Sequence, residues 1–253
     1  MWRSRAALAV LVFVAALLPR VVGSHAPPPF DDLYHLKRIA WSAAHFPHVL
    51  AFDTDRGFHG AWCPWPPLYD ATLGGVARLF GMESVLWLPP LGMSLFAAAL
   101  AWILARRLGL LAGAVAGLLV AIHPYLVPVS SVGSVDHHWA EPLLVTLILW
   151  STILRRTRSS IVLGAAITIA LFVQTALIVA AALAFIALFF IEDDPRRGAI
   201  AFAIPAFAVA LYRLAQPAAY PSNPWFLGWP HAAVLAAAAV ACAARVLGAK
   251  RLV

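Results

Sequence analysis

The sequence predicts an all-α polytopic membrane protein: a helical bundle of about eight spanning helices, with a long outer loop that contains short amphipathic helices. Of the 253 residues, 63% are hydrophobic and 11% are charged, whereas soluble domains average about 45–50% apolar and about 25% charged residues. The mean hydropathy is +0.86, and the apolar residues gather in stretches long enough to cross a bilayer. This composition excludes a water-soluble globule and a disordered chain.

The first predicted span runs from Ala6 to Val22 and follows two arginines, Arg3 and Arg5. The basic start, the apolar stretch and the small residue Gly23 fit a cleaved signal peptide as well as a retained helix. In both cases the residues that follow lie outside the cytoplasm.

Seven further spans follow from the remaining apolar stretches. The run from 159 to 191 is too long for one crossing, because about 33 residues at 1.5 Å each reach roughly 50 Å. We therefore divide it near Gln174. The other predicted spans are Ser84–Leu104, Leu108–Val127, Trp139–Leu154, Gly198–Ala215 and His231–Leu247. An even number of spans places both termini on one side, and residues 1–253 are predicted to form a single membrane domain.

The basic residues indicate which side is cytoplasmic. With the N-terminus inside, twelve of the 18 Lys and Arg residues fall in the cytoplasm. They are Arg3, Arg5, Arg106, Arg107, Arg155, Arg156, Arg158, Arg196, Arg197, Arg245, Lys250 and Arg251. We predict that both termini are cytoplasmic. This sidedness explains the formal charge of +7, so no nucleic-acid partner is expected.

Most acids and all nine histidines then map to the outer half of the protein, which has three outer segments. The first, residues 23–82, has two stretches with apolar residues at helical spacing, which predict two short helices. The second of these helices follows Pro66-Pro67 and, at about 14 residues, is more typical of an interfacial helix than of a span. The other outer segments are residues 128–138 and residues 216–230. The outer side is either a solvated surface or a place where chemistry occurs at a metal.

One candidate site directly follows the first span, in the run Asp31-Asp32-Leu33-Tyr34-His35. Asp31 fits the N-cap of the first short helix, where a carboxylate accepts a backbone N–H. An acid just outside the membrane also fits a divalent cation or a substrate amide. The residues alone leave both interpretations open.

A second candidate site is the run Ser134-Val135-Asp136-His137-His138-Trp139-Ala140-Glu141, which joins two predicted spans. In an extended chain, Asp136 and His138 point the same way and can reach one ion. Carboxylate and imidazole suit Mn²⁺, Zn²⁺ or Fe²⁺, whereas all-oxygen sites suit Mg²⁺ better. The alternative is that Asp136 caps the next helix. Ionisable residues at a membrane boundary favour a functional interpretation.

Four ordered stretches resemble the catalytic subunit of oligosaccharyltransferase, in its archaeal and bacterial forms, within the C-type glycosyltransferase superfamily. They are DDLYHLKRI at 31–39, Phe46-Pro47 with Asp53, PWPPLYD at 64–70 and GSVDHHWAE at 133–141. The resemblance extends to about Leu154, so the chain is similar to the N-terminal half of these enzymes.

The resemblance implies a role for each matching residue. Asp31 and Asp136 are the expected catalytic residues, and with His138 they are the expected ligands of a divalent metal, Mn²⁺ first, with Mg²⁺ or Zn²⁺ as alternatives. The expected donor-binding residues are Lys37, Arg38 and His137. The implied activity is transfer of a sugar or glycan from a polyprenyl-(pyro)phosphate donor to an acceptor on the outer face. We expect that acceptor to be a protein, and the membrane to be a prokaryotic plasma (inner) membrane.

The sequence also departs from this family. The Trp-Trp-Asp motif that reads the acceptor sequon is absent, as is the late outer acidic motif that completes the acceptor site. Acceptor-binding residues are therefore unassigned. The alternative interpretation is a non-catalytic or split-enzyme fragment that needs a partner chain for the acceptor site. A transporter is less consistent, because transporters place polar sites near the bilayer midplane.

Overall fold

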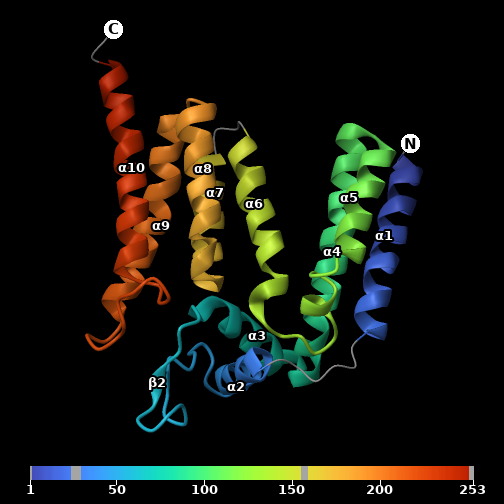
Figure 1. The fold of residues 1–253 in the computed structure, drawn as a ribbon, viewed down its shortest axis with the longest axis horizontal. Coiled ribbons are helices and arrows are strands. Elements are labelled where there is room, and N and C mark those ends of the chain that lie inside the picture. Colours follow the sequence, from blue (N-terminus) through green and yellow to red (C-terminus); the bar gives the residue numbers. More distant parts are fainter. Residues whose placement is uncertain (1, 24–29, 155–158, 251–253) are drawn as a thin grey trace. The chain divides into compact units, whose positions relative to one another are not determined.

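The computed structural model of the chain describes residues 2–23, 30–154 and 159–250, which are mostly helical (Figure 1). Arg155, Arg156, Arg158 and Arg251 of the topology prediction lie outside these residues. The helices are α1 (Trp2–Val22), α2 (Phe30–His45), α3 (Pro67–Phe80), α4 (Met82–Leu108), α5 (Leu110–Ile122), α6 (Glu141–Ile153), α7 (Ser159–Val173), α8 (Ile178–Ile186), α9 (Pro195–Ala215) and α10 (Trp229–Lys250). The all-α prediction is confirmed.

Short elements connect these helices. They are the strands β1 (Phe52–Asp53) and β2 (Ala61–Trp62), the 3-10 turns η1 (Pro128–Ser130), η2 (His137–Trp139) and η3 (Thr175–Leu177), and the π-helical turn η4 (Ala187–Ile191). The contacts divide the chain into two compact units. The first unit comprises residues 1–49 and 70–140, and the second comprises residues 50–69 and 141–253.

Small residues hold together the three apolar helices of the first unit, α1, α4 and α5, which lie side by side in Figure 1. Gly113, Gly117 and Ala121 recur every fourth residue and therefore share one buried face of α5. A Cβ built on Gly117 would lie 2.8 Å from the Cβ of Ala101 and 2.8 Å from Cγ1 of Val12. Helices in lipid associate through such close contacts, because burial there provides no hydrophobic gain.

Arg20 ties the end of α1 to the end of α5, and its side chain is fully buried. Its guanidinium donates to the carbonyl oxygens of Ala121 at 2.9 Å and Val120 at 3.1 Å. Its Nε donates to Ser130 Oγ at 2.6 Å. The last carbonyls of a helix have no partner within the helix, and a cation is favoured there. Arg20 thus completes the C-terminus of α5 and fixes the chain that follows.

The second unit packs its helices around an apolar core. Ile148, Leu163, Leu188, Phe202 and Leu235 are buried in one cluster, and they come from α6, α7, η4, α9 and α10 respectively. Helix α9 lies between α7 and α10 and packs on both. The two strands form an antiparallel pair, with Phe52 opposite Trp62.

The predicted division near Gln174 is confirmed. Helix α7 ends at Val173, and Gln174 has an extended backbone, with φ −151° and ψ 123°. Its side-chain oxygen accepts the N–H of Ala176 at 3.4 Å, which starts the next turn. A side chain that bonds its own backbone two residues on competes with helix continuation.

The predicted boundaries differ from the structure by a few residues in most helices, and two of these differences have a clear local cause. Helix α5 ends at Ile122 rather than Val127, because Pro124 lacks an N–H and disfavours the helical conformation for His123 before it. Helix α6 begins at Glu141 rather than Trp139, since residues 137–139 form the 3-10 turn η2.

Four of the described helices are long and apolar enough to cross a membrane, which supports an integral membrane protein. They are Trp2–Val22, Met82–Leu108, Pro195–Ala215 and Trp229–Gly248. Leu110–Ile122, Ser159–Val173 and Thr175–Ile191 are apolar but shorter. The count of eight spans remains a prediction.

The close packing at Gly117 predicts a clear contrast between two Gly→Ala substitutions. Gly117→Ala should lower stability by about 1–3 kcal/mol, because the added methyl group has no space. Gly248→Ala in α10 meets nothing within 4 Å and should be neutral or stabilising by up to about 1 kcal/mol. Thermal unfolding of each variant in detergent, followed by circular dichroism, measures the difference. Equal melting temperatures would contradict the packing account.

Candidate functional site

The site begins on α2, where the side that packs into the protein is polar. The buried residues of α2 that recur at helical spacing are Asp32, His35, Arg38, Ile39 and Ser42. Leu33, in contrast, is 52% exposed. Of the apolar stripe that the sequence predicts for this helix, Ile39 is buried, whereas Leu33 and Ala40 are exposed. Buried charges need partners to offset their loss of hydration, and the neighbouring segments provide them.

Helix α3 provides one partner because Gly74 lets it approach α2 closely. A Cβ on Gly74 would lie 2.6 Å from the Cβ of Ser42. Asp70 lies one turn before Gly74, and Arg38 lies one turn before Ser42, and the two side chains are in contact. Asp70 Oδ2 forms an ion pair of 2.5 Å with Arg38 Nη1, and its Oδ1 accepts a hydrogen bond of 2.7 Å from His35 Nδ1.

The segment 131–139 provides the second partner. Gly133, at φ 90°, adopts a conformation that favours glycine, and its N–H donates to the carbonyl of Leu86 in α4 at 3.2 Å. Asp32 Oδ1 accepts the N–H of Asp136 at 2.7 Å and the hydroxyl of Ser134 at 3.5 Å. Asp32 therefore holds this segment against the first turn of α2.

The turn η2 then presents two imidazoles. The side chain of Asp136 caps η2 and accepts the N–H of His137 at 2.6 Å. Trp139 ends the turn and packs on α4, where a Cβ on Gly92 would lie 2.5 Å from Cζ3 of its indole. The capping alternative considered from the sequence therefore holds for a 3-10 turn that starts at His137.

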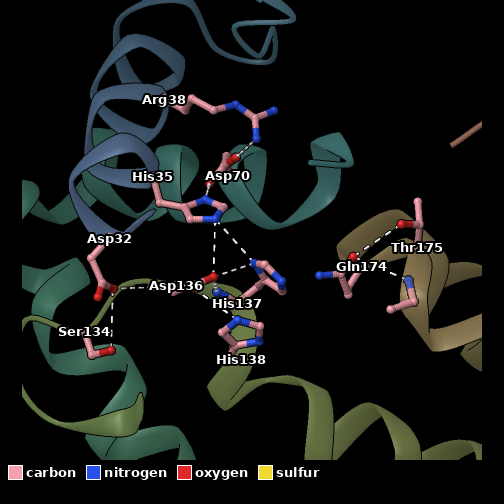
Figure 2. A network of polar contacts seen from close by, with 11 residues as sticks. Asp32, His35, Arg38, Asp70, Ser134, Asp136, His137, His138, Gln174 and Thr175 are labelled. Carbon is pink, nitrogen blue, oxygen red and sulfur yellow. Dashed lines mark hydrogen bonds and ion pairs between the residues drawn. The ribbon is translucent and has the colours of Figure 1, made fainter. Parts of the chain in front are cut away.

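Asp136 lies at the centre of the resulting group (Figure 2). Its Oδ1 is 2.6 Å from His137 Nδ1 and 3.4 Å from His35 Nε2, and these two nitrogens are 3.3 Å apart. Its Oδ2 is 3.4 Å from His138 Nε2, on a side chain that is 38% exposed. His35 and His137 are buried. One carboxylate thus faces two buried imidazoles with one oxygen and an accessible imidazole with the other.

The electrostatics of this group favour the charged forms of His35 and Asp136. Burial lowers the pKa of His35, but hydrogen bonds and charge interactions with Asp136 and Asp70 outweigh it and raise the pKa to about 9. Burial also disfavours the charged form of Asp136, yet hydrogen bonds from His137 and His35 hold its pKa well below the usual range. For Asp32, burial raises the pKa and backbone hydrogen bonds from Asp136 and Val135 counteract part of that effect.

The donor set of this group fits a divalent transition metal. His35, Asp136 and His137 each offer one ligand atom, and these atoms lie within 4.8 Å of one another. Metal bonds of about 2.0–2.1 Å in a tetrahedron place ligand atoms roughly 3.3 Å apart. The distances from His35 Nε2 to Asp136 Oδ1 and to His137 Nδ1, 3.4 Å and 3.3 Å, are close to this value. Two imidazoles and a carboxylate suit Zn²⁺, Mn²⁺ or Fe²⁺. Binding requires that the facing ring nitrogens lose their protons.

The residues expected from the sequence lie in different surroundings. Asp136, His137 and His138 lie together, as described above. Arg38 is buried against Asp70, whereas Asp31 and Lys37 are exposed on α2. Helix α2 begins at Phe30, so Asp31 lies inside its first turn and does not cap it.

Sequence reasoning included His35 in the first candidate run and Asp70 in a matching stretch, but it assigned neither of them to the group. The available signal was the recurrence of polar residues every three or four positions at 32, 35, 38 and 42, which marks one face of a helix. Asp70 carried no comparable local signal, because its importance arises from the contact between two helices.

The raised pKa of His35 predicts that the metal-free protein loses stability in mild alkali. The ordinary pKa is 6.5 and the folded value is about 9. The stabilisation is therefore complete below pH 6.5 and is lost as the pH rises through about 9, by about 3 kcal/mol in total. Thermal midpoints with chelator at pH 6.5 to 10, compared with those of His35→Gln, isolate this contribution. An equal fall of the thermal midpoint with pH in the original protein and in His35→Gln would contradict this assignment.

Comparison with known proteins identifies the fold. No protein-family model matches the chain, and no curated protein matches it. The crystal structure of the oligosaccharyltransferase of Archaeoglobus fulgidus in the apo form matches with a TM-score of 0.79, at 18% identity over 95% of this chain and 32% of that chain. The crystal structure of the same enzyme in a complex with Zn and sulfate matches with a TM-score of 0.77, at 17% identity over 94% of this chain and 35% of that chain. The archaeal oligosaccharyltransferase AglB in complex with an inhibitory peptide and a dolichol-phosphate matches with a TM-score of 0.79, at 18% identity over 95% of this chain and 32% of that chain. The chain spans about a third of the length of these proteins, and it has the fold of that part of an archaeal oligosaccharyltransferase.

Proposed function

We propose that this chain is the metal-dependent module of a membrane glycosyltransferase of the oligosaccharyltransferase type. It transfers a sugar or glycan from a polyprenyl-(pyro)phosphate donor to an acceptor, a protein in our proposal, on the outer face of a prokaryotic plasma membrane. The observation that carries the proposal is the Asp136 carboxylate between the imidazoles of His35 and His137, within a fold shared with archaeal oligosaccharyltransferases.

A divalent cation bound at Asp136 would neutralise the phosphate group that leaves the sugar. Mn²⁺ is our first candidate, and Zn²⁺ is supported by the complex of the archaeal enzyme with Zn and sulfate. Oδ2 of Asp136 faces the half-exposed His138, so a ligand from solution can reach this side of the carboxylate. We propose Asp31 as a further ligand, because it is exposed in the first turn of α2 and occupies the position to which the resemblance assigns this role.

The donor phosphate needs a positive charge that solvent can reach. Lys37 is exposed on α2 and meets this requirement, so we assign the donor contact to Lys37. The guanidinium of Arg38 is buried and paired with Asp70, which favours a structural task for Arg38. His137 faces Asp136 with Nδ1, which favours metal binding over a direct contact with the donor.

A second candidate function is that of a fragment that works only with a partner chain. The chain spans about a third of the length of the oligosaccharyltransferases that it resembles, and no acceptor-binding residue is assigned. The partner would then provide the acceptor site. Transfer from a radiolabelled lipid-linked sugar in membranes that contain the chain, with and without Mn²⁺, distinguishes a self-sufficient enzyme from such a fragment.

Asp136→Asn should abolish metal-dependent transfer. The amide keeps the shape and an acceptor for the N–H of His137, but it loses the charge that a cation requires, so transfer should fall by at least about 100-fold. Asp55→Asn, on the exposed hairpin between β1 and β2, is the matched control and should retain activity. Unchanged transfer by Asp136→Asn would show that the carboxylate is not at the reaction centre.

Substitution of Asp32 should mainly lower stability, whereas substitution of the adjacent Asp31 should mainly lower activity. Asp32→Ala removes the acceptor for the buried N–H of Asp136 and should lower stability by about 1–3 kcal/mol. Asp31→Ala changes an exposed side chain and should alter stability by less than about 0.5 kcal/mol, while transfer is lost. Melting temperatures and transfer rates of both variants measure this. Full transfer by Asp31→Ala would exclude it as a ligand.

A further inference from the structure

Three buried ionisable side chains lie in a row that begins within the Asp136 group at His35 and continues away from Asp136 through Asp70 to Arg38. The side chains of Arg38, Asp70 and His35 are 2%, 0% and 1% exposed. Burying such groups is costly, and apolar residues of similar size often give equal or greater stability. Stability alone therefore does not explain why these three residues are buried, and their geometry indicates a functional role.

Asp70 uses its two oxygens for two different neighbours. Oδ2 pairs with Arg38 at 2.5 Å, and Oδ1 accepts the Nδ1–H of His35 at 2.7 Å. The proton on Nδ1 is thereby fixed, and the ring is oriented so that Nε2 faces Asp136 Oδ1 at 3.4 Å and His137 Nδ1 at 3.3 Å. Histidines that bind a metal through one ring nitrogen donate the other N–H to a carboxylate in this manner.

The row is built on helices, whereas the rest of the group lies on a connecting segment. His35 and Arg38 lie on α2 and Asp70 lies on α3, and the contact of Gly74 with Ser42 sets the spacing of these helices. Asp136 and His137 belong to the segment at η2. Sites on helices are held more precisely than sites on loops, so His35 is the ligand whose position is set in advance.

We propose that Asp70 and Arg38 are positioning residues for a metal at the Asp136 group: Asp70 orients His35 so that Nε2 serves as a ligand, and Arg38 fixes Asp70. This rests on the proposed function only in that a divalent cation binds there. Asp70 and Arg38 act through His35 and contact neither the ion nor the substrate.

The test measures Mn²⁺ and Zn²⁺ binding by the full chain in detergent, with free Mn²⁺ followed by its electron paramagnetic resonance signal and Zn²⁺ by competition. Asp70→Asn keeps an oxygen acceptor and removes the charge, so affinity should fall by about 10–100-fold. Glu83→Gln, in the first turn of α4, is the matched control and should bind as the original protein does. Arg38→Lys keeps the charge but not the fixed geometry, and should weaken binding by a smaller factor. It also provides the test should Asp70→Asn fail to fold.

A double-mutant cycle shows whether Asp70 acts through His35. In a His35→Asn background, the further change Asp70→Asn should leave metal affinity unaltered, whereas a merely structural role would weaken binding again. Independent losses, or no loss in either Asp70→Asn or Arg38→Lys, would overturn the positioning role and leave the proposed function intact. Failure of the original protein to bind either ion would overturn both.

Discussion

The close approach of α2 and α3 is the constraint on which the site depends. Where Gly74 meets Ser42 there is no space for another side chain, and this spacing places Asp70 between Arg38 and His35. The buried carboxylate then determines which nitrogen of His35 carries a proton and which faces Asp136. Gly74, which has no side chain, thus determines how this group of ionisable side chains is arranged.

The sequence was informative about helices and about the segment with Asp136, because both leave local signals. Long apolar stretches predicted where helices run, and the length of the run at 159–191 predicted a break near Gln174. The spacing of Asp136 and His138 indicated that both side chains can reach one ion. Helix α2 was harder, because its apolar residues repeat correctly but Leu33 is exposed. In a membrane protein an apolar face can be turned to lipid and a polar face to the protein, so periodicity alone does not tell inside from outside. Asp70 could not be predicted, since its role arises from contact between elements.

The arrangement gives the two sides of one carboxylate different tasks. Oδ1 of Asp136 faces buried imidazoles that helices and capping hydrogen bonds hold in place, and Oδ2 faces the more accessible His138. Such a division suits a reaction in which an ion is retained by the protein while a phosphate ligand comes and goes. Asp32 contributes by holding the backbone of Asp136, so adjacent acids of α2 differ sharply in what they contact.

The buried guanidinium of Arg20 has a consequence for biosynthesis. It emerges early from the ribosome, but its partners Val120, Ala121 and Ser130 follow about a hundred residues later. During that interval the guanidinium has the carbonyl of Ala16 on its own helix but lacks its other partners, and it can extend toward the interface. We expect lipid phosphates to accompany it there as temporary counter-ions. The nascent first helix would then be sensitive to the anionic lipid content of its membrane.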